Sequence, residues 1–311
     1  MNPLPARQRG VALLVALLVV ALAVILVAAL LDRGELALAR TRNLLRAEQA
    51  EAYAQGVEAY AARALEAARD QEGGMDTSAS AWAVPLPPQP VPGGVIAATV
   101  RDQNGCFNLN NLAPARPDAA QWLALFRRLL GVLALREDIA QAARDWQDPQ
   151  ASASAYLAQP VPYRPRGGPF AHVSELRLLR GMDGPAYARL APWVCALPAG
   201  TRLNVNTAGV PLLQALGLPE ALARRLWNRG QARFASVADF STAAGVPLQM
   251  PVSALDVGSR YFLARADVAL EDIPFVFYSL IERVPGRPIR VIARSRGGDG
   301  SAAPVDGLPD R

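Results

Sequence analysis

The apolar residues near the start of the chain form one uninterrupted run that passes into a long helix-forming segment. Val11 to Leu31 contains no charged or polar side chain, and about 20 residues at roughly 1.5 Å each cover the roughly 30 Å hydrocarbon core of a bilayer. Leu36 to Asp70 is dominated by alanine, leucine, arginine and glutamate and has no proline, which favours a helix. The pattern predicts a membrane span over 11–31 and a continuing helix over 32–72 that ends near Gly73-Gly74.

Beyond this helix, short segments with strand patterns precede and follow a long middle part of the chain. Val95 to Val100 is strand-like, whereas Ser78 to Gly94 carries many proline, serine and glycine residues and is interpreted as an irregular connection. Phe275–Arg283 and Ile289–Arg294 are interpreted as the two arms of a β-hairpin. Residues 299–311, rich in glycine, aspartate and proline, are predicted to be disordered.

Helical patterns occupy the middle of the chain. From Asp118 to about Arg144, apolar residues recur at three- and four-residue spacing, and this core-facing stripe consists of Trp122, Leu125, Phe126, Leu129, Leu130 and Leu133. Pro149–Pro169 is interpreted as a loop, and a second helical block opens at Leu203 and runs to about Ala244. The order of elements predicts an α+β fold, in which a long amino-terminal helix packs on a small antiparallel sheet and a large all-helical domain is inserted between the strands.

The charges that flank the apolar run indicate its orientation in a membrane. Arg7 and Arg9 precede the run and acidic residues follow it, so the positive-inside rule leaves the amino terminus in the cytoplasm and sends the rest of the chain across. A cleaved secretory signal is one alternative, but the run is longer than a usual signal core and leads directly into helix. A plain signal anchor is another alternative.

Charge and rare residues exclude most enzyme classes. The formal net charge is +5, and all the cations are arginines spread along the chain, so no patch for nucleic acid is indicated. One histidine and two cysteines exclude zinc sites with several such ligands and iron–sulfur clusters. A catalytic triad would have to use His172, whose nearest candidate partner in sequence is Glu175. We interpret His172 as a structural or surface residue and predict no enzymatic activity.

The residues around the apolar run resemble the leader of the type IV pilin-like family. Arg7-Gln8-Arg9-Gly10 is followed at once by the hydrophobic helix, and in that family a prepilin peptidase cuts after the glycine. The resemblance implies cleavage between Gly10 and Val11. Most members carry a glutamate at the fifth mature position, which is thought to pair with the neighbouring amino terminus, whereas this chain has Val15. The departure suits a subunit at the filament tip, which has no subunit ahead of it.

A collinear series of further segments narrows the resemblance. The series is Asn104–Leu112, Asp145–Asp148, Phe170–Leu176, Arg180–Met182, Trp193–Pro198 and Leu203–Ala208. It resembles the general secretion pathway protein K family, the large minor pseudopilins of type II secretion. The resemblance implies a pilin-like fold whose insertion contains two sterile-alpha-motif-like units. It also implies a place at the pseudopilus tip, minor pseudopilins I and J as partners, and an inner-membrane protein with a periplasmic domain.

These inferences divide the chain into consecutive parts. They are a leader (1–10), a transmembrane helix (11–31), the periplasmic part of the long helix (32–72), a pilin-like β domain (73–112 and 262–298), an inserted helical domain (113–261) and the tail (299–311). The apolar face of the long helix is predicted to contact the sheet or neighbouring pseudopilins through Leu36, Ala39, Asn43, Leu44 and Ala47. The predicted function is to nucleate the pseudopilus for protein export across the outer membrane.

Two alternative functions come from the same residues. A type IV pilus minor pilin would share the leader and the long helix. Leu203–Arg229 also resembles a helix-hairpin-helix unit, in which backbone amides contact DNA phosphates. Leu216-Gly217-Leu218 supplies only part of the usual hairpin, and the arginines that could reach phosphate, Arg224, Arg225 and Arg229, are equally a solvated helix face.

A calcium site is a further candidate, and it rests on two aspartates. Asp145 and Asp148 flank Trp146, and calcium takes six to eight oxygen ligands. Family members carry additional acidic residues just downstream, whereas this chain has Gln150, Ser152 and Ser154 there. We favour the alternative that these are polar residues at a helix end beside a buried tryptophan, with no cofactor bound.

The two cysteines are predicted to form a disulfide, Cys106–Cys195. If the chain crosses the membrane, both lie in an oxidising compartment, where free thiols seldom persist. Each precedes an asparagine-rich segment, Asn108-Leu109-Asn110 and Leu203–Asn206 respectively, so the two stretches are candidates for neighbours beside the helical insertion. The alternative is two separate buried cysteines that behave as small apolar residues.

Overall fold

The computed structural model describes residues 6–297, with side chains from Val11 onward. Residues 1–5 of the predicted leader and the predicted disordered tail lie outside this range. The chain divides into two compact parts, Met1–Ala52 and Tyr53–Arg311, and helix α1 (Ala6–Glu72) contributes to both. The helix ends as predicted, because Gly73 and Gly74 follow it with φ of 63° and 86°, a backbone conformation that only glycine adopts without strain.

A five-stranded antiparallel sheet forms the body of the second part, in the order β1-β2-β7-β8-β9. Its strands are β1 (Leu86–Val91), β2 (Gly94–Asp102), β7 (Tyr261–Leu270), β8 (Ile273–Glu282) and β9 (Arg290–Arg296). The sheet is therefore assembled from two distant stretches of the chain, and β2 pairs directly with β7.

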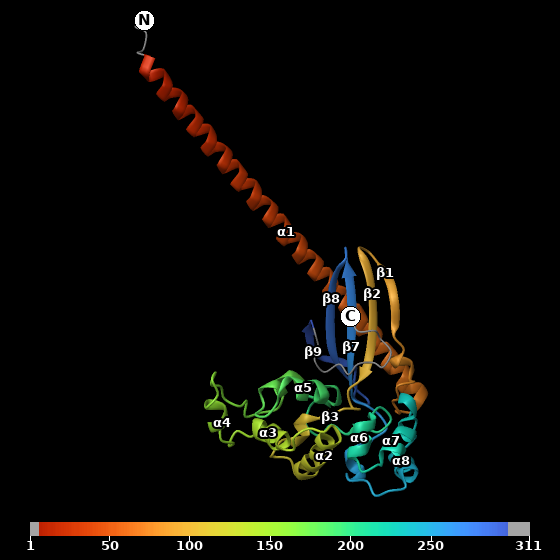
Figure 1. Cartoon of the computed structure of the whole chain (residues 1–311). Helices are drawn as coiled ribbons and strands as arrows, with labels where there is room; N and C mark the ends of the chain where they lie inside the picture. The colour runs from red at the N-terminus through yellow and green to blue at the C-terminus, as the bar shows by residue number, and fades with distance from the viewer. Residues whose placement is uncertain (1–5, 298–311) are drawn as a thin grey trace. The chain divides into compact units, whose positions relative to one another are not determined.

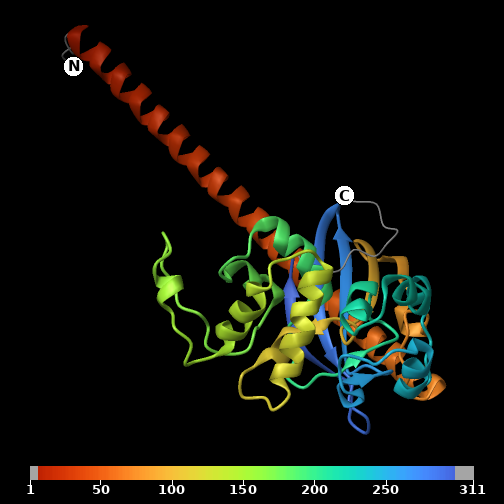
Figure 2. The same ribbon diagram turned by 60° about the horizontal axis from the view of Figure 1, so that its bottom comes forward.

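The helical insertion leaves the sheet after β2 and returns at β7, and Figures 1 and 2 show its helices gathered beyond that end of the sheet. Its elements are β3 (Phe107–Asn108), α2 (Ala119–Val132), α3 (Asp138–Gln147), α4 (Ser154–Leu157), α5 (Gly184–Leu190), β4 (Val194–Cys195), β5 (Leu203–Asn204), α6 (Val210–Ala215), α7 (Glu220–Trp227), α8 (Val237–Ala244) and β6 (Leu255–Asp256). Its short 3₁₀ helices are η2 (Leu109–Leu112), η3 (Val173–Leu178), η4 (Ala191–Trp193), η5 (Asn228–Gly230) and η6 (Val252–Ala254). A further 3₁₀ helix, η1 (Ala81–Ala83), precedes β1 and lies outside the insertion. The predicted α+β class is confirmed.

The carboxyl-terminal part of α1 packs on the sheet through small and branched residues. Ala61, Leu65 and Ala68 are buried in one cluster with Phe262 and Ile281. Their spacing of three and four residues places them on one helix face. The predicted face, which includes Leu36 and Leu44, is not part of this cluster, and these two side chains are 52% and 60% exposed. The predicted contact with the sheet is therefore wrong, and the alternative contact with neighbouring pseudopilins stays a prediction.

One continuous core fills the helical insertion. The predicted α2 stripe is buried, with Trp122, Leu125, Phe126, Leu129 and Leu130 at 3% exposure or less and Leu133 partly buried. The same core takes in Phe107 and Leu112, so the asparagine-rich run belongs with the insertion. The boundary predicted at 112/113 therefore lies later than the point at which the chain leaves the sheet, Asp102.

One element was misread from the sequence. Ser78–Gly94 was interpreted as irregular, yet it contains strand β1 with Pro87, Pro88 and Pro90. Proline lacks the N–H that an interior strand needs, but an edge strand tolerates it, and β1 is at the edge of the sheet.

Candidate functional site

The amino-terminal part of α1 carries the residues of the predicted processing site. Gly10 and Val11 are consecutive residues within the helix, and Val11 begins the one segment among the described residues that is long and apolar enough to span a membrane. Val15 is 53% exposed and offers no carboxylate to a neighbour. This part of the chain is suited to burial in lipid or against other apolar helices.

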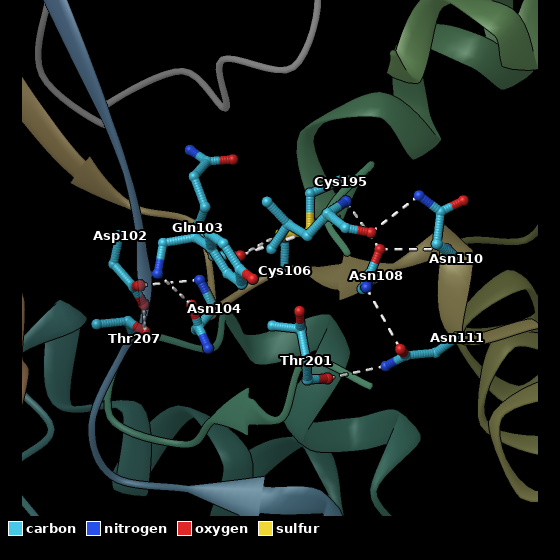
Figure 3. The surroundings of a disulfide bond; sticks show 12 residues. Asp102, Gln103, Asn104, Cys106, Asn108, Asn110, Asn111, Cys195, Thr201 and Thr207 are labelled. Carbon is cyan, nitrogen blue, oxygen red and sulfur yellow. Dashed lines mark hydrogen bonds between the residues drawn. A yellow bond between two sulfur atoms is a disulfide. The ribbon is translucent and has the colours of Figure 1, made fainter. Parts of the chain in front are cut away.

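The structure brings the two cysteines together in a disulfide (Figure 3), the pair expected from the sequence. Their Cα atoms are 5.8 Å apart. β3 and β4 pair in parallel with Asn108 opposite Cys195, so the bond joins two backbones that are already hydrogen-bonded. It closes a stretch of 89 residues that contains α2 to α5.

The asparagine-rich segments form two copies of one hydrogen-bonding arrangement. The Asn110 side chain donates to Phe170 O at 3.0 Å and accepts from Phe170 N at 2.7 Å. The Asn206 side chain does the same with Phe234, at 3.1 and 2.7 Å. Asn108 Oδ1 accepts from Asn110 N in the first copy, and Asn204 Oδ1 accepts from Asn206 N in the second. Because a side-chain amide both donates and accepts, it can satisfy the backbone N–H and C=O of one buried loop residue, as a neighbouring strand would.

Each copy follows a short parallel ladder that holds the ends of one helical unit together. β3 pairs with β4 in the first unit, and β5 pairs with β6 in the second. The sequence showed both asparagine runs, but sequence alone did not reveal that their partners are the distant backbones of Phe170 and Phe234.

Buried charges join α1, the sheet and the insertion. Asp76 follows α1 and pairs with Arg283, which follows β8, and the two side chains are 1% and 5% exposed. Asp76 also accepts from Trp82 Nε1 at 3.1 Å and from Ser259 N at 2.7 Å. Burial raises the pKa of Asp76, although the neighbouring Arg283 opposes this shift. The sequence gives no signal for this buried pair, because single charges beside turns resemble solvated ones.

Glu58 is a second buried carboxylate, on the face of α1 that meets the sheet. It accepts from Ser279 Oγ at 2.6 Å and from Arg294 Nε at 2.6 Å. Burial alone would raise its pKa, but the hydrogen bonds from Arg294 and Ser279 hold the pKa below the ordinary glutamate value. The ionised group therefore ties β8 and β9 to the helix.

The two aspartates of the calcium candidate lie at the end of α3. Asp145 Oδ1 accepts from Gln141 Nε2 at 2.7 Å, and Asp148 Oδ1 accepts from Gln150 N at 2.8 Å. Trp146 between them is 3% exposed. Within residues 6–297, no cluster of three or more histidine, cysteine or acidic side chains is placed to share a metal. Each aspartate is hydrogen-bonded to a neighbouring residue of its own segment, and the absence of bound calcium stays a prediction.

His172 serves as the amino-terminal cap of η3. Its Nδ1 accepts from Ser174 N at 3.1 Å, while Glu175 accepts from His172 N at 3.2 Å. Glu175 also accepts from Trp146 Nε1 at 3.1 Å. These contacts hold a turn in place and give His172 a structural role.

The helix-hairpin-helix candidate is present in shape, as α6, a turn at Gly217 and α7. The hairpin amides are used inside the chain, because Gly217 N donates to Gln214 O at 2.9 Å and Leu218 N donates to Leu213 O at 3.3 Å. Arg224 pairs with Glu220 at 2.7 Å. These two amides already donate to backbone carbonyls of the same chain and are not free to bind a phosphate, which argues against the DNA-binding alternative.

Comparison with known proteins matches almost the whole chain. Two family models, both described as type II secretion system (T2SS), protein K, match residues 105–199 and 203–258. Type II secretion system protein K of Pseudomonas aeruginosa is 37% identical over 97% of this chain and 97% of its own length. The protein of the same name from Pectobacterium carotovorum subsp. carotovorum is 33% identical over 94% and 97%.

A solved structure supports the same relationship. A chain from the crystal structure of the GspK-GspI-GspJ complex of the enterotoxigenic Escherichia coli type 2 secretion system superposes with a TM-score of 0.72 at 30% identity. The match covers 83% of this chain and 99% of that chain. These similarities favour secretion over the type IV pilus and DNA-uptake alternatives. The two matched regions also coincide with the two helical units that the short ladders close.

Proposed function

The chain belongs to the type II secretion system protein K family, and we propose that it is the minor pseudopilin at the tip of the type II secretion pseudopilus. There it nucleates the filament that drives protein export across the outer membrane. The observation that carries the proposal is helix α1, which runs from an exposed apolar segment into a segment packed on the sheet. Val15, in place of a carboxylate, leaves the subunit without the usual contact to a subunit ahead, which suits the tip.

Minor pseudopilins I and J are the proposed partners. The solved structural relative was crystallised in a GspK-GspI-GspJ complex, and the extended apolar face of α1 offers this chain a comparable means of helix packing. Co-expression of the full-length chain with its I and J counterparts, followed by detergent extraction and gel filtration, should give a single co-eluting complex. Separate elution of all three proteins at micromolar concentration would contradict the tip assignment.

The proposed location is the inner membrane, with the amino terminus in the cytoplasm and the large domain in the periplasm. Prepilin peptidase would cleave between Gly10 and Val11, where the absence of a side chain allows a protease close to the backbone. Gly10→Phe should leave full-length precursor, detected as unshortened mass by intact-protein mass spectrometry. Gly34→Phe in the same helix is the control and should be processed normally, because a side chain there meets no atom within 4 Å. Normal processing of the Gly10 variant would rule out this cleavage site.

The proposed work of the protein is assembly, without enzymatic activity or a required cofactor. The calcium alternative is tested by calorimetry on the detergent-solubilised chain, where titration with calcium should release no binding heat. Binding heat that disappears in an Asp145→Asn, Asp148→Asn variant would restore the calcium site.

A further inference from the structure

An open cleft lies where the end of α1, the sheet and the helical insertion meet. Its volume is about 740 Å³, which is within the range of ligand-binding clefts. Its lining includes two loops, Pro198–Arg202 from the insertion and Val284–Pro285 after β8, together with Asn104 and Tyr261. The functions discussed above make no use of this cleft.

Cations dominate the charged lining. Four guanidinium groups face the cleft, those of Arg69, Arg202, Arg260 and Arg283, against the single carboxylate of Asp256. Arg283 is neutralised by buried Asp76. The other three arginine side chains are 34% (Arg69), 59% (Arg202) and 51% (Arg260) exposed, so they remain accessible to a ligand.

The counter-charges of these arginines are exposed or shared. Arg69 donates from Nε and Nη2 to Asp70 Oδ1 at 3.2 Å, and the Asp70 side chain is 70% exposed, so this surface pair contributes little. Arg202 Nη1 is 3.5 Å from Asp256 Oδ2, and both groups are exposed, so this pair contributes little. Arg260 binds Glu282, but the second oxygen of Glu282 is held by Arg290 at 2.5 Å. One carboxylate thus serves two cations, so Glu282 neutralises Arg260 only in part.

The lining around Asn104 is held in place by hydrogen bonds. Asn104 Oδ1 accepts from Arg260 N at 3.2 Å and from Tyr261 N at 3.0 Å, while its Nδ2 donates to Arg202 O at 3.1 Å. One asparagine therefore fixes the backbones that carry two of the three accessible arginines. Such preorganisation lowers the entropic cost of binding an anion.

The lining distinguishes among anionic ligands. The same lining includes the apolar side chains of Pro198, Val284 and Pro285. An inorganic anion would use the arginines alone and leave these apolar side chains without a partner. Tyr261, the aromatic residue in the described lining, is 2% exposed, so it offers no ring face on which a sugar could stack. A peptide with carboxylates and apolar side chains satisfies both parts of the lining, because guanidinium groups bind carboxylates bidentately.

We propose that this cleft binds an acidic, extended peptide segment of another protein, whose carboxylates are held by Arg69, Arg202 and Arg260. The proposal is separate from tip assembly, which relies on α1. If it fails, co-elution with I and J is unaffected.

Fluorescence anisotropy on the full-length chain in detergent tests the cleft. The probe is a fluorescein-labelled decapeptide of alternating glutamate and valine, and the control peptide alternates glutamine and valine. We expect the glutamate peptide to bind at least tenfold more tightly, and its affinity to fall as salt is raised. Arg202→Gln and Arg69→Gln should each weaken it about tenfold. Arg225→Gln, which removes an exposed arginine of α7 outside the cleft, should have no effect.

Three outcomes would overturn the proposal. Equal binding of the two peptides would show that carboxylates are not recognised. Equal loss in the Arg225 variant would show nonspecific attraction to any arginine. Displacement of the peptide by an equal concentration of inorganic pyrophosphate would identify a simple anion site instead. Arg202 is exposed and makes only a long ion pair, so its replacement leaves the fold intact and the test interpretable.

Discussion

Asp102 is the last residue of β2 and the point at which the insertion begins. Its carboxylate accepts from the Thr207 hydroxyl of the insertion and from Asn104 N at 2.8 Å. Burial nevertheless raises its pKa to about 6, because these donors do not fully replace water. A raised aspartate pKa means that the folded state binds the proton more tightly than the unfolded state. The ionised group therefore costs stability at neutral pH, and that cost disappears as the pH falls from about 6 to below the ordinary aspartate pKa of 3.8.

Asp102→Asn should remove this titration. The amide oxygen can still accept from Asn104 N, and the amide NH2 can donate to the Thr207 hydroxyl, which reverses the direction of that bond. The free energy of unfolding of the variant, compared with that of the wild type, should be most favourable at pH 7. This difference should shrink by about 1–3 kcal/mol between pH 7 and pH 4. Urea unfolding of both proteins at a series of pH values measures the difference. A constant difference between pH 7 and pH 4 would show that Asp102 titrates normally.

Asn206 offers a sharper test of the repeated amide arrangement. Asn206→Asp keeps the shape and the acceptor for Phe234 N, but an ionised carboxylate cannot donate to Phe234 O or Val257 O. Because Asn206 is 0% exposed, the free energy of unfolding of the variant should be lower than that of the wild type by about 2–3 kcal/mol at pH 7. The loss should shrink in acid, where the carboxyl group can donate. Asn228→Asp at an exposed left-handed position is the matched control and should be nearly neutral.

Among the elements, β3 and β4 lie at the disulfide of the insertion, because Cys195 is in β4 and Cys106 directly precedes β3. Replacing both cysteines by serine should lower the free energy of unfolding by about 4–5 kcal/mol, because the 89-residue loop is no longer closed in the unfolded chain. Reductant should produce the same loss in the wild type and none in the variant. Thiol labelling of the denatured, unreduced protein should find no reactive cysteine. Two labelled thiols would mean that the bond is absent in cells.

Elements with a regular pattern could be predicted from sequence, and those held by distant partners could not. The β8–β9 hairpin was found because its arms are apolar around a turn, and its strands are Ile273–Glu282 and Arg290–Arg296. The adjacent β7–β8 turn was missed, since Glu271 and Asp272 have φ of 47° and 66° without the glycine that usually marks such a turn. In the same way the asparagine runs were visible, but their roles depend on backbones 28 and 60 residues away.

At the scale of the whole molecule, the insertion is an expansion of a single hairpin turn. β2 and β7 are antiparallel neighbours with Asp102 opposite Phe262, and Gln103 N donates to Tyr261 O at 2.9 Å. All the helices α2 to α8 are therefore accommodated between two residues that already face each other. This topology lets a pilin-like body carry a large additional domain without altering its sheet.

The topology predicts that the body folds without the insertion. Replacing residues 104–260 by Asn-Gly joins Gln103 to Tyr261 through a two-residue turn that suits the twist of the flanking strands. The shortened chain should retain the five-stranded sheet and unfold cooperatively, although Asp76 loses its bond from Ser259 N and some stability with it. Circular dichroism and limited proteolysis measure the outcome. Deleting only 203–258 is the informative control, because one hydrophobic core runs through both helical units and its exposure should cause aggregation. A shortened chain that is unfolded, or a partial deletion that is as stable as the full chain, would show that the body and the insertion are not separate folding units.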